Sequence, residues 1–246
     1  MFDWLWRNTL LSISEEERSW IDYRFDWLIK EFGLDDLREI TVVLPTIEFF
    51  PNTYDGSDAD VQNILRIVCN TMTVDRTRVR LRFFDDNTYV DGINSGASGL
   101  YAKTRRKEEI WLSTRILEDP MKVVATLSHE LAHAKLIGEK RIHPNNDQDH
   151  EKLTDLATVY FGMGIFTSNC VLRESYWNAG QMSGWQMERG GYLSMNEFGY
   201  ALALFSLARN EPNAGWHCFL RRDVRASLKQ GIRFKSQKAN QIGQLP

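Results

Sequence analysis

Between Asp119 and Gly138 the sequence carries both a start signal and a stop signal for one long helix, and this segment constrains the fold more than any other. Asp119 is followed directly by Pro120, the order expected when a capping side chain precedes the first helical residue. Gly138 stands where the helical pattern ends, as a terminating glycine often does. The sequence therefore predicts a helix that begins at Asp119-Pro120 and runs to about Ile137.

Two histidines lie four residues apart inside this predicted helix, in the motif HELAH at 129–133. At 3.6 residues per turn, the two imidazoles share one face of the helix. Imidazoles placed in this way can bind one Zn²⁺ at about 2.0–2.1 Å each. In this motif the glutamate after the first histidine acts on the water that the metal activates, without being a ligand. The other face is apolar and can bury the helix: Val123, Val124, Leu127 and Leu131.

The sequence downstream of the motif offers a third metal ligand, which a catalytic zinc site needs besides its open position. Glu151 and Asp155 lie four residues apart at the start of the next predicted helix, so they share a face. We expect Glu151 to complete a His₂Glu set and Asp155 to accept a hydrogen bond from the outer ring N–H of His129. The alternatives that stay open for the third ligand are Glu139, His150, Asp155 and His143, of which His143 is better interpreted as a solvated loop residue.

The combination of HELAH at 129–133 with ExxxD at 151–155 resembles the gluzincins, the metallopeptidase group that includes thermolysin. The resemblance covers residues 109–166, from a predicted strand to the end of the helix that carries ExxxD. The resemblance implies that His129, His133 and Glu151 bind the zinc and that Glu130 is the general base. It also implies that Asp155 contacts one of the ligands without binding the zinc itself. The metzincin pattern is disfavoured because it needs Gly at 136 and His at 139, where this chain has Leu136 and Glu139.

The order of the predicted elements indicates an α+β fold, with a small mixed sheet that leads into a helical body. We expect it to be zincin-like, with the HExxH helix packed beside the sheet. A single domain over residues 1–246 would contain an N-terminal α/β portion (1–100), a metal-site core (100–170) and a helical C-terminal portion (171–246). The predicted helices are 14–32, 58–72, 119–137, 150–166, 196–209 and 222–229, and the predicted strands are 40–44, 79–84, 100–103 and 109–113.

The composition of the chain limits which binding partners and which cellular compartment we expect for it. The formal net charge of the chain is −3, which gives no electrostatic reason to bind nucleic acid or an anionic membrane. Nothing resembles a run of about 18 apolar residues that could span a membrane. Three scattered cysteines, Cys69, Cys170 and Cys218, are typical of reduced thiols in a cytoplasmic protein.

These features predict a zinc-dependent hydrolase, favoured as a metallopeptidase that cleaves a peptide or protein with Glu130 as general base. An extended substrate would lie beside residues 109–113. The alternatives are a non-catalytic metal-binding regulatory protein and an amide hydrolase for small molecules. A glycine-rich stretch at 180–191 fits a surface loop better than a lid over the site. The candidates for stabilising the oxyanion are unranked: Tyr160, Tyr192, Tyr200 and His217.

Overall fold

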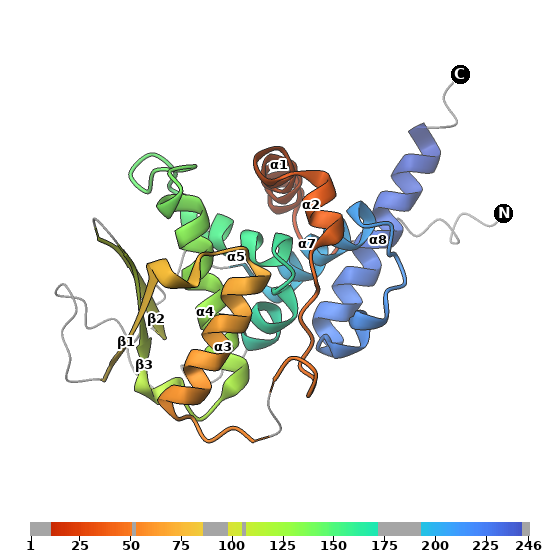
Figure 1. Cartoon of the computed structure of the whole chain (residues 1–246). Coiled ribbons are helices and arrows are strands. Elements are labelled where there is room, and N and C mark those ends of the chain that lie inside the picture. The colour runs from red at the N-terminus through yellow and green to blue at the C-terminus, as the bar shows by residue number, and fades with distance from the viewer. Residues whose placement is uncertain (1–10, 51–52, 86–97, 105–106, 172–192, 243–246) are drawn as a thin grey trace, which may run out of the picture.

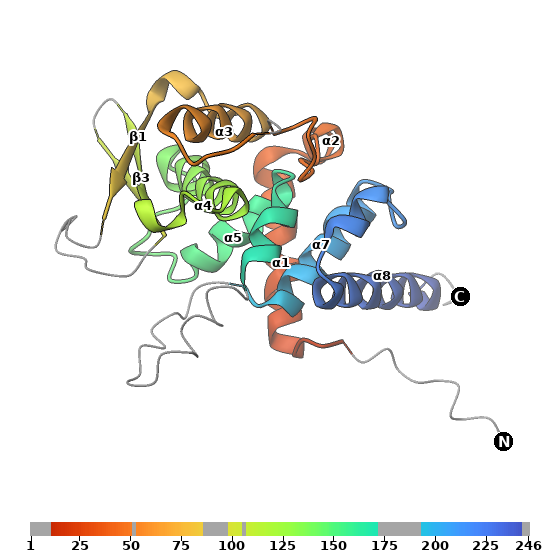
Figure 2. The same ribbon diagram turned by 90° about the horizontal axis from the view of Figure 1, so that it is seen from below.

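The computed structural model describes residues 11–50, 53–85, 98–104, 107–171 and 193–242 of the chain. In this part of the chain a small sheet lies at one end of a larger body of helices (Figures 1 and 2). The sheet is mixed and has three strands. The predicted α+β class and the small mixed sheet are therefore confirmed.

The three strands of the sheet are not arranged in sequence order. They are β1 (Val79–Phe84), β2 (Gly99–Lys103) and β3 (Glu108–Ser113). Strand β3 is in the middle, parallel to β1 and antiparallel to β2, and Tyr101 of β2 lies opposite Ile110 of β3. Both edges of β3 are therefore paired, so an extended substrate cannot add to β3 itself by backbone hydrogen bonds. Among the described strands, β2 lies next to β3 and forms one edge of the sheet.

The main helices begin close to where the sequence predicts. They are α1 (Glu15–Phe32), α3 (Asp58–Thr71), α4 (Pro120–His133), α5 (His150–Tyr160), α7 (Met195–Ala208) and α8 (Arg222–Ile242), with a short helix, α2 (Leu34–Glu39), between α1 and α3. The Ser14 hydroxyl accepts from the backbone N–H of Glu17, whose carboxylate accepts from the backbone N–H of Ser14, so the predicted capping box starts α1. The Asp119 carboxylate caps α4, which begins at Pro120 as expected.

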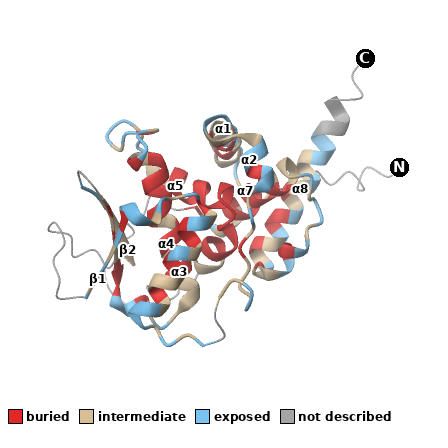
Figure 3. Cartoon of the chain, viewed as in Figure 1, coloured by how far each residue is buried: buried red, intermediate tan, exposed pale blue. Residues whose placement is uncertain are grey.

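Helix α4, which carries the HELAH motif, is at the centre of the fold. It packs against β2 and β3 on one side and against α3 and α5 on others. Buried residues are concentrated in α4, α5 and α7 (Figure 3). The predicted apolar face of α4 is buried, since Val123, Val124, Leu127 and Leu131 are each no more than 1 % exposed. This packing fixes the helix and with it the direction of its two histidine side chains.

The predicted strand at 40–44 is wrong, and this segment instead lies close against Gly162. These residues form no strand, and the backbone N–H of Val43 donates to the carbonyl of Gly162 instead. Gly162 has φ +77°, and a Cβ there would lie 2.6 Å from the carbonyl oxygen of Thr41. Only glycine permits both this conformation and this close approach. The same glycine interrupts the predicted helix 150–166, which ends at Tyr160 and resumes at residues 164–171.

The structure departs from the prediction at two further helix ends. Helix α4 does not continue regularly to Ile137, because it passes after His133 into one π-helical turn over Ala134–Gly138. Helix α8 is longer than predicted and ends at Ile242. A short helix, α2, was not predicted at all.

Two expectations from composition can be compared with the described residues. None of their helices is long and apolar enough to cross a membrane. No disulfide joins Cys69, Cys170 and Cys218, all of which lie in the described part of the chain.

Candidate metal centre

Helices α4 and α5 bring three metal-binding side chains together. His129 and His133 project from α4, and Glu151 projects from the first turn of α5. One ligand atom from each residue lies within 4.8 Å of the other two. The carboxylate oxygen Oε2 of Glu151 is 3.1 Å from Nε2 of His129 and 3.5 Å from Nε2 of His133. His129 and His133 of α4 therefore converge with Glu151 of α5 on one point.

The spacing of these atoms fits a metal ion. Four ligands arranged as a tetrahedron about Zn²⁺, at about 2.0–2.1 Å, would lie about 3.3–3.4 Å from one another. The two distances from Glu151 Oε2 are 3.1 and 3.5 Å, on either side of that value. His133 is buried, whereas the Glu151 side chain is 36 % exposed. The cluster can hold a metal ion, and it is accessible to solvent on the Glu151 side.

Asp155 lies behind the first histidine. Its oxygen Oδ1 is 2.9 Å from Nδ1 of His129, and its oxygen Oδ2 accepts from the backbone N–H of Leu193 at 2.9 Å. With both oxygens engaged, Asp155 holds the outer nitrogen of His129 and leaves Nε2 directed at Glu151. The expected contact between Asp155 and His129 is therefore present, and its influence on a bound metal stays a prediction.

The alternative third ligands lie outside the cluster. The Glu139 carboxylate pairs with Lys135 at 2.6 Å and with Arg141 at 3.0 Å. The ring of His150 is 6.3 Å from that of His133, centroid to centroid, and its Nδ1 is 3.6 Å from Glu151. Of the described residues, only His129, His133 and Glu151 form a group with metal-ligand spacing.

The charges in the cluster are arranged to receive a cation. Burial lowers the pKa of His129, but hydrogen bonds with Asp155 and Glu151 raise it well above its usual value. Burial raises the pKa of Glu151, but its contacts with His129 and His133 hold that pKa far below its usual range. Glu151 is therefore a carboxylate at neutral pH, and positive charge between it and Asp155 is strongly favoured.

The first turn of α5 is fixed from outside the cluster as well. Asp149, directly before α5, accepts from the indole N–H of Trp20 at 2.8 Å and from Nε and Nη2 of Arg24 at 2.7 and 2.6 Å. Both donors belong to α1. Burial raises the pKa of Asp149, and these hydrogen bonds lower it overall, so Asp149 stays charged. Helix α1 thus holds in place the turn that carries Glu151.

Glu130 is buried beside the cluster without belonging to it. Burial raises the pKa of Glu130, and the neighbouring His129 and His133 oppose that rise. Strand β2 passes very close, because a Cβ on Gly99 would lie 2.8 Å from Oε1 of Glu130 and 2.4 Å from Cγ2 of Thr126. A glycine at this position lets the edge strand approach the carboxylate.

Gly99→Ala should therefore lower the melting temperature. The added methyl group collides with Thr126 and Glu130, and overpacking of this kind costs about 1–3 kcal/mol. For a chain of this size each kcal/mol corresponds to about 2–4 °C. Thermal unfolding followed by circular dichroism measures the shift. The matched control is Gly215→Ala, where a Cβ meets nothing within 4 Å. Equal melting temperatures for the two variants would contradict the close approach of β2 to α4.

Three of the four predicted oxyanion candidates are engaged elsewhere. The Tyr160 hydroxyl donates to the carbonyl of Gly33 at 2.5 Å, and the Tyr200 hydroxyl donates to Asp22 at 2.8 Å. Nε2 of His217 lies 3.3 Å from the hydroxyl of Ser206. These contacts are those of structural residues in the helical body. The remaining candidate, Tyr192, and the stretch 180–191 lie outside the described residues.

A tyrosine that sequence reasoning missed lies against the cluster. The ring of Tyr101, on β2, stacks on the ring of His133 with centroids 5.8 Å apart and planes 23° apart. Its hydroxyl donates to the buried carboxylate of Glu108 on β3. The pattern of residues 100–103 predicts a strand, but no local signal says that this strand borders α4. Thr154 was missed too, although its position between Glu151 and Asp155 on one helix could have drawn attention to it.

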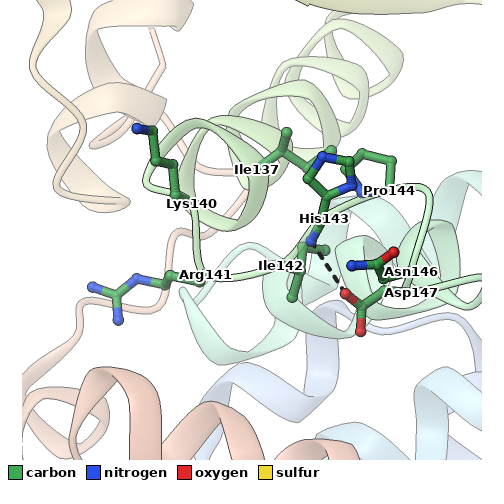
Figure 4. Close-up of a pocket in the computed structure, with 8 residues that line it drawn as sticks. All are labelled: Ile137, Lys140, Arg141, Ile142, His143, Pro144, Asn146 and Asp147. Atoms are coloured by element: carbon green, nitrogen blue, oxygen red, sulfur yellow. Dashed lines mark hydrogen bonds between the residues drawn. The ribbon is translucent and has the colours of Figure 1, made fainter.

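The loop that follows α4 forms a surface pocket of about 450 Å³, which is separate from the His129–His133–Glu151 cluster. Figure 4 shows its lining, where the backbone N–H of His143 donates to Asp147 at 3.1 Å. None of the three cluster residues lines it. His143 is exposed, in agreement with its interpretation as a loop residue.

Comparison with known proteins adds no family to these observations. No family model matches the chain, and we found no significant match among curated proteins or among solved structures. The chain is thus described by its mixed α+β fold and by a His129–His133–Glu151 cluster, compatible with an HExxH motif, that can hold a metal ion.

Proposed function

We propose that this protein is a zinc-dependent metallopeptidase of the gluzincin type, with a zincin-like core around α4 and α5. The observation that carries the proposal is the convergence of His129, His133 and Glu151 within 4.8 Å, with the buried carboxylate of Glu130 alongside. Structural zinc sites are closed by four protein ligands, whereas catalytic sites use three and stay open. Three donors with solvent access on one side fit the catalytic kind.

The roles of the residues follow from their positions. His129, His133 and Glu151 would hold the ion, and bound zinc supplies Lewis acidity for water and for a carbonyl group. Glu130 would take a proton from the attacking water on its carboxylate and return it to the leaving nitrogen.

The position of β2 favours an extended peptide as the substrate. Gly99 of β2 lies against Glu130, and Tyr101 lies against His133, so the strand runs along the proposed site. Among the described strands, β2 pairs only with β3, and its other edge is the one that we propose a peptide uses. A peptide that adds to this edge would pass beside Glu130 and the ligands. A small amide would make no use of such an edge.

The experiment that tests the proposal is hydrolysis of fluorescently labelled casein, with the zinc content of the same sample measured by elemental analysis. We expect about one zinc per chain, as in a three-ligand catalytic site, and measurable hydrolysis. Removal of the metal with a chelator should abolish hydrolysis, and stoichiometric zinc should restore it. A zinc-loaded protein that cleaves neither casein nor a fluorogenic peptide library would overturn the peptidase proposal and favour a binding role.

A further inference from the structure

The outer nitrogen of the second histidine has a partner of its own. Nδ1 of His133 lies 3.2 Å from the hydroxyl of Thr154, and both side chains are buried. The same hydroxyl donates to the backbone carbonyl of His150 at 2.7 Å. His150 and Thr154 are separated by one turn of α5, so the hydroxyl is directed by its own helix.

The position of one proton follows from these two contacts. A carbonyl oxygen can only accept, so the single hydroxyl proton of Thr154 is directed at His150. Toward His133 the hydroxyl then presents a lone pair, and Nδ1 of His133 must donate to it. In the neutral ring, Nε2 consequently carries the lone pair, and this is the nitrogen 3.5 Å from Glu151.

We propose that Thr154 is the positioning residue for His133, fixing the tautomer and the ring orientation that present Nε2 to a divalent metal. This inference rests on the proposed function, since it concerns the same metal. Asp155 does the corresponding work for His129 through its contact with Nδ1 at 2.9 Å. Residues 150–155 of α5 thus supply the third ligand together with a partner for each of the other two.

The surroundings of His133 leave its ring little freedom. Tyr101 stacks on one face of the ring, and the Tyr101 hydroxyl is itself held by Glu108. The stacking restricts the tilt of the ring but has no influence on which nitrogen carries the proton. In the described part of the chain, only Thr154 lies within hydrogen-bond distance of His133 Nδ1. The tautomer therefore depends on this hydroxyl.

Thr158 provides a matched control on the same helix. It is fully buried like Thr154, and its hydroxyl donates to the carbonyl of Asp155 at 2.7 Å. The other neighbour of the Thr158 hydroxyl is Thr167, 2.9 Å away, and no cluster residue is involved. Replacing either threonine with valine removes one buried hydroxyl, but only Thr154→Val removes the partner of His133.

The test is the zinc affinity of the full-length protein, measured by competition with a chromophoric chelator, and the visible spectrum of the Co²⁺-substituted protein. Thr154→Val should weaken zinc binding about 10–100-fold, the usual effect of losing the partner of a metal-ligating histidine. Its Co²⁺ spectrum should change as well. Thr154→Ser keeps the hydroxyl and should restore both affinity and spectrum, and Thr158→Val should bind zinc as the parent does even if it melts earlier.

The possible outcomes separate this inference from the proposed function. A parent protein that binds no zinc would overturn both. A parent that binds zinc with the same affinity as Thr154→Val would overturn the role of Thr154 alone. Equal losses in Thr154→Val and Thr158→Val would show general destabilisation and would also overturn it. If Thr154→Val does not fold, Thr154→Ala is measured in its place, with the same expected loss and the same rescue by serine.

Discussion

Replacing Glu130 with glutamine should leave zinc bound and remove hydrolysis. Glutamine has the shape of glutamate but cannot accept a proton from water, so the general-base step is lost. Glu130 lies outside the group of three ligands, and the metal content should therefore not change. General acid–base groups contribute about 10²–10⁴-fold to rate, and we expect a loss in that range. The measurement is the rate of casein hydrolysis per mole of bound zinc.

Glu139→Gln is the matched control for this substitution. Glu139 lies a few residues further along the chain, where its carboxylate pairs with Lys135 and Arg141 and with no cluster residue. The control loses one acidic side chain from the same region and should keep the parental rate. If Glu130→Gln hydrolyses casein as fast as the parent does, Glu130 is not the base, and the proposed mechanism fails.

The features that the sequence predicted well are local ones. Helix α4 begins at Pro120 because Asp119 caps it, and these two signals are adjacent residues. The shared face of His129 and His133 follows from the period of the helix alone. Glu151 and Asp155 likewise share a face of α5, as their spacing predicts, and both contact His129.

The features that were missed depend on contacts between distant segments. Residues 40–44 have the β-branched composition of a strand, but composition of this kind reports only a fit to a half-buried surface. Here the backbone N–H of Val43 bonds instead to the carbonyl of Gly162, more than a hundred residues away in the chain. The approach of Gly99 and Tyr101 to α4 depends on the strand order β1-β3-β2, which no local pattern encodes. The contact between Thr154 and His133 could not be predicted either, because it depends on how α5 packs against α4.

Replacing His133 with alanine should abolish zinc binding. The substitution removes one of three donors, and the two that remain, His129 and Glu151, are too few to hold the ion against solvent. Elemental analysis of the purified variant should find almost no zinc, compared with about one ion per chain for the parent. Circular dichroism should show that the helices of the variant are retained, since the apolar face of α4 is untouched.

His143→Ala is the control that separates loss of the ligand from loss of any histidine. His143 is exposed in the loop after α4 and lies in the pocket of Figure 4, outside the cluster. This variant should therefore keep its zinc and its rate of casein hydrolysis. Full zinc occupancy in a folded His133→Ala protein would mean that the ion is bound elsewhere. Two imidazoles one helical turn apart would then be a coincidence of the sequence, and the metallopeptidase proposal would have to be abandoned.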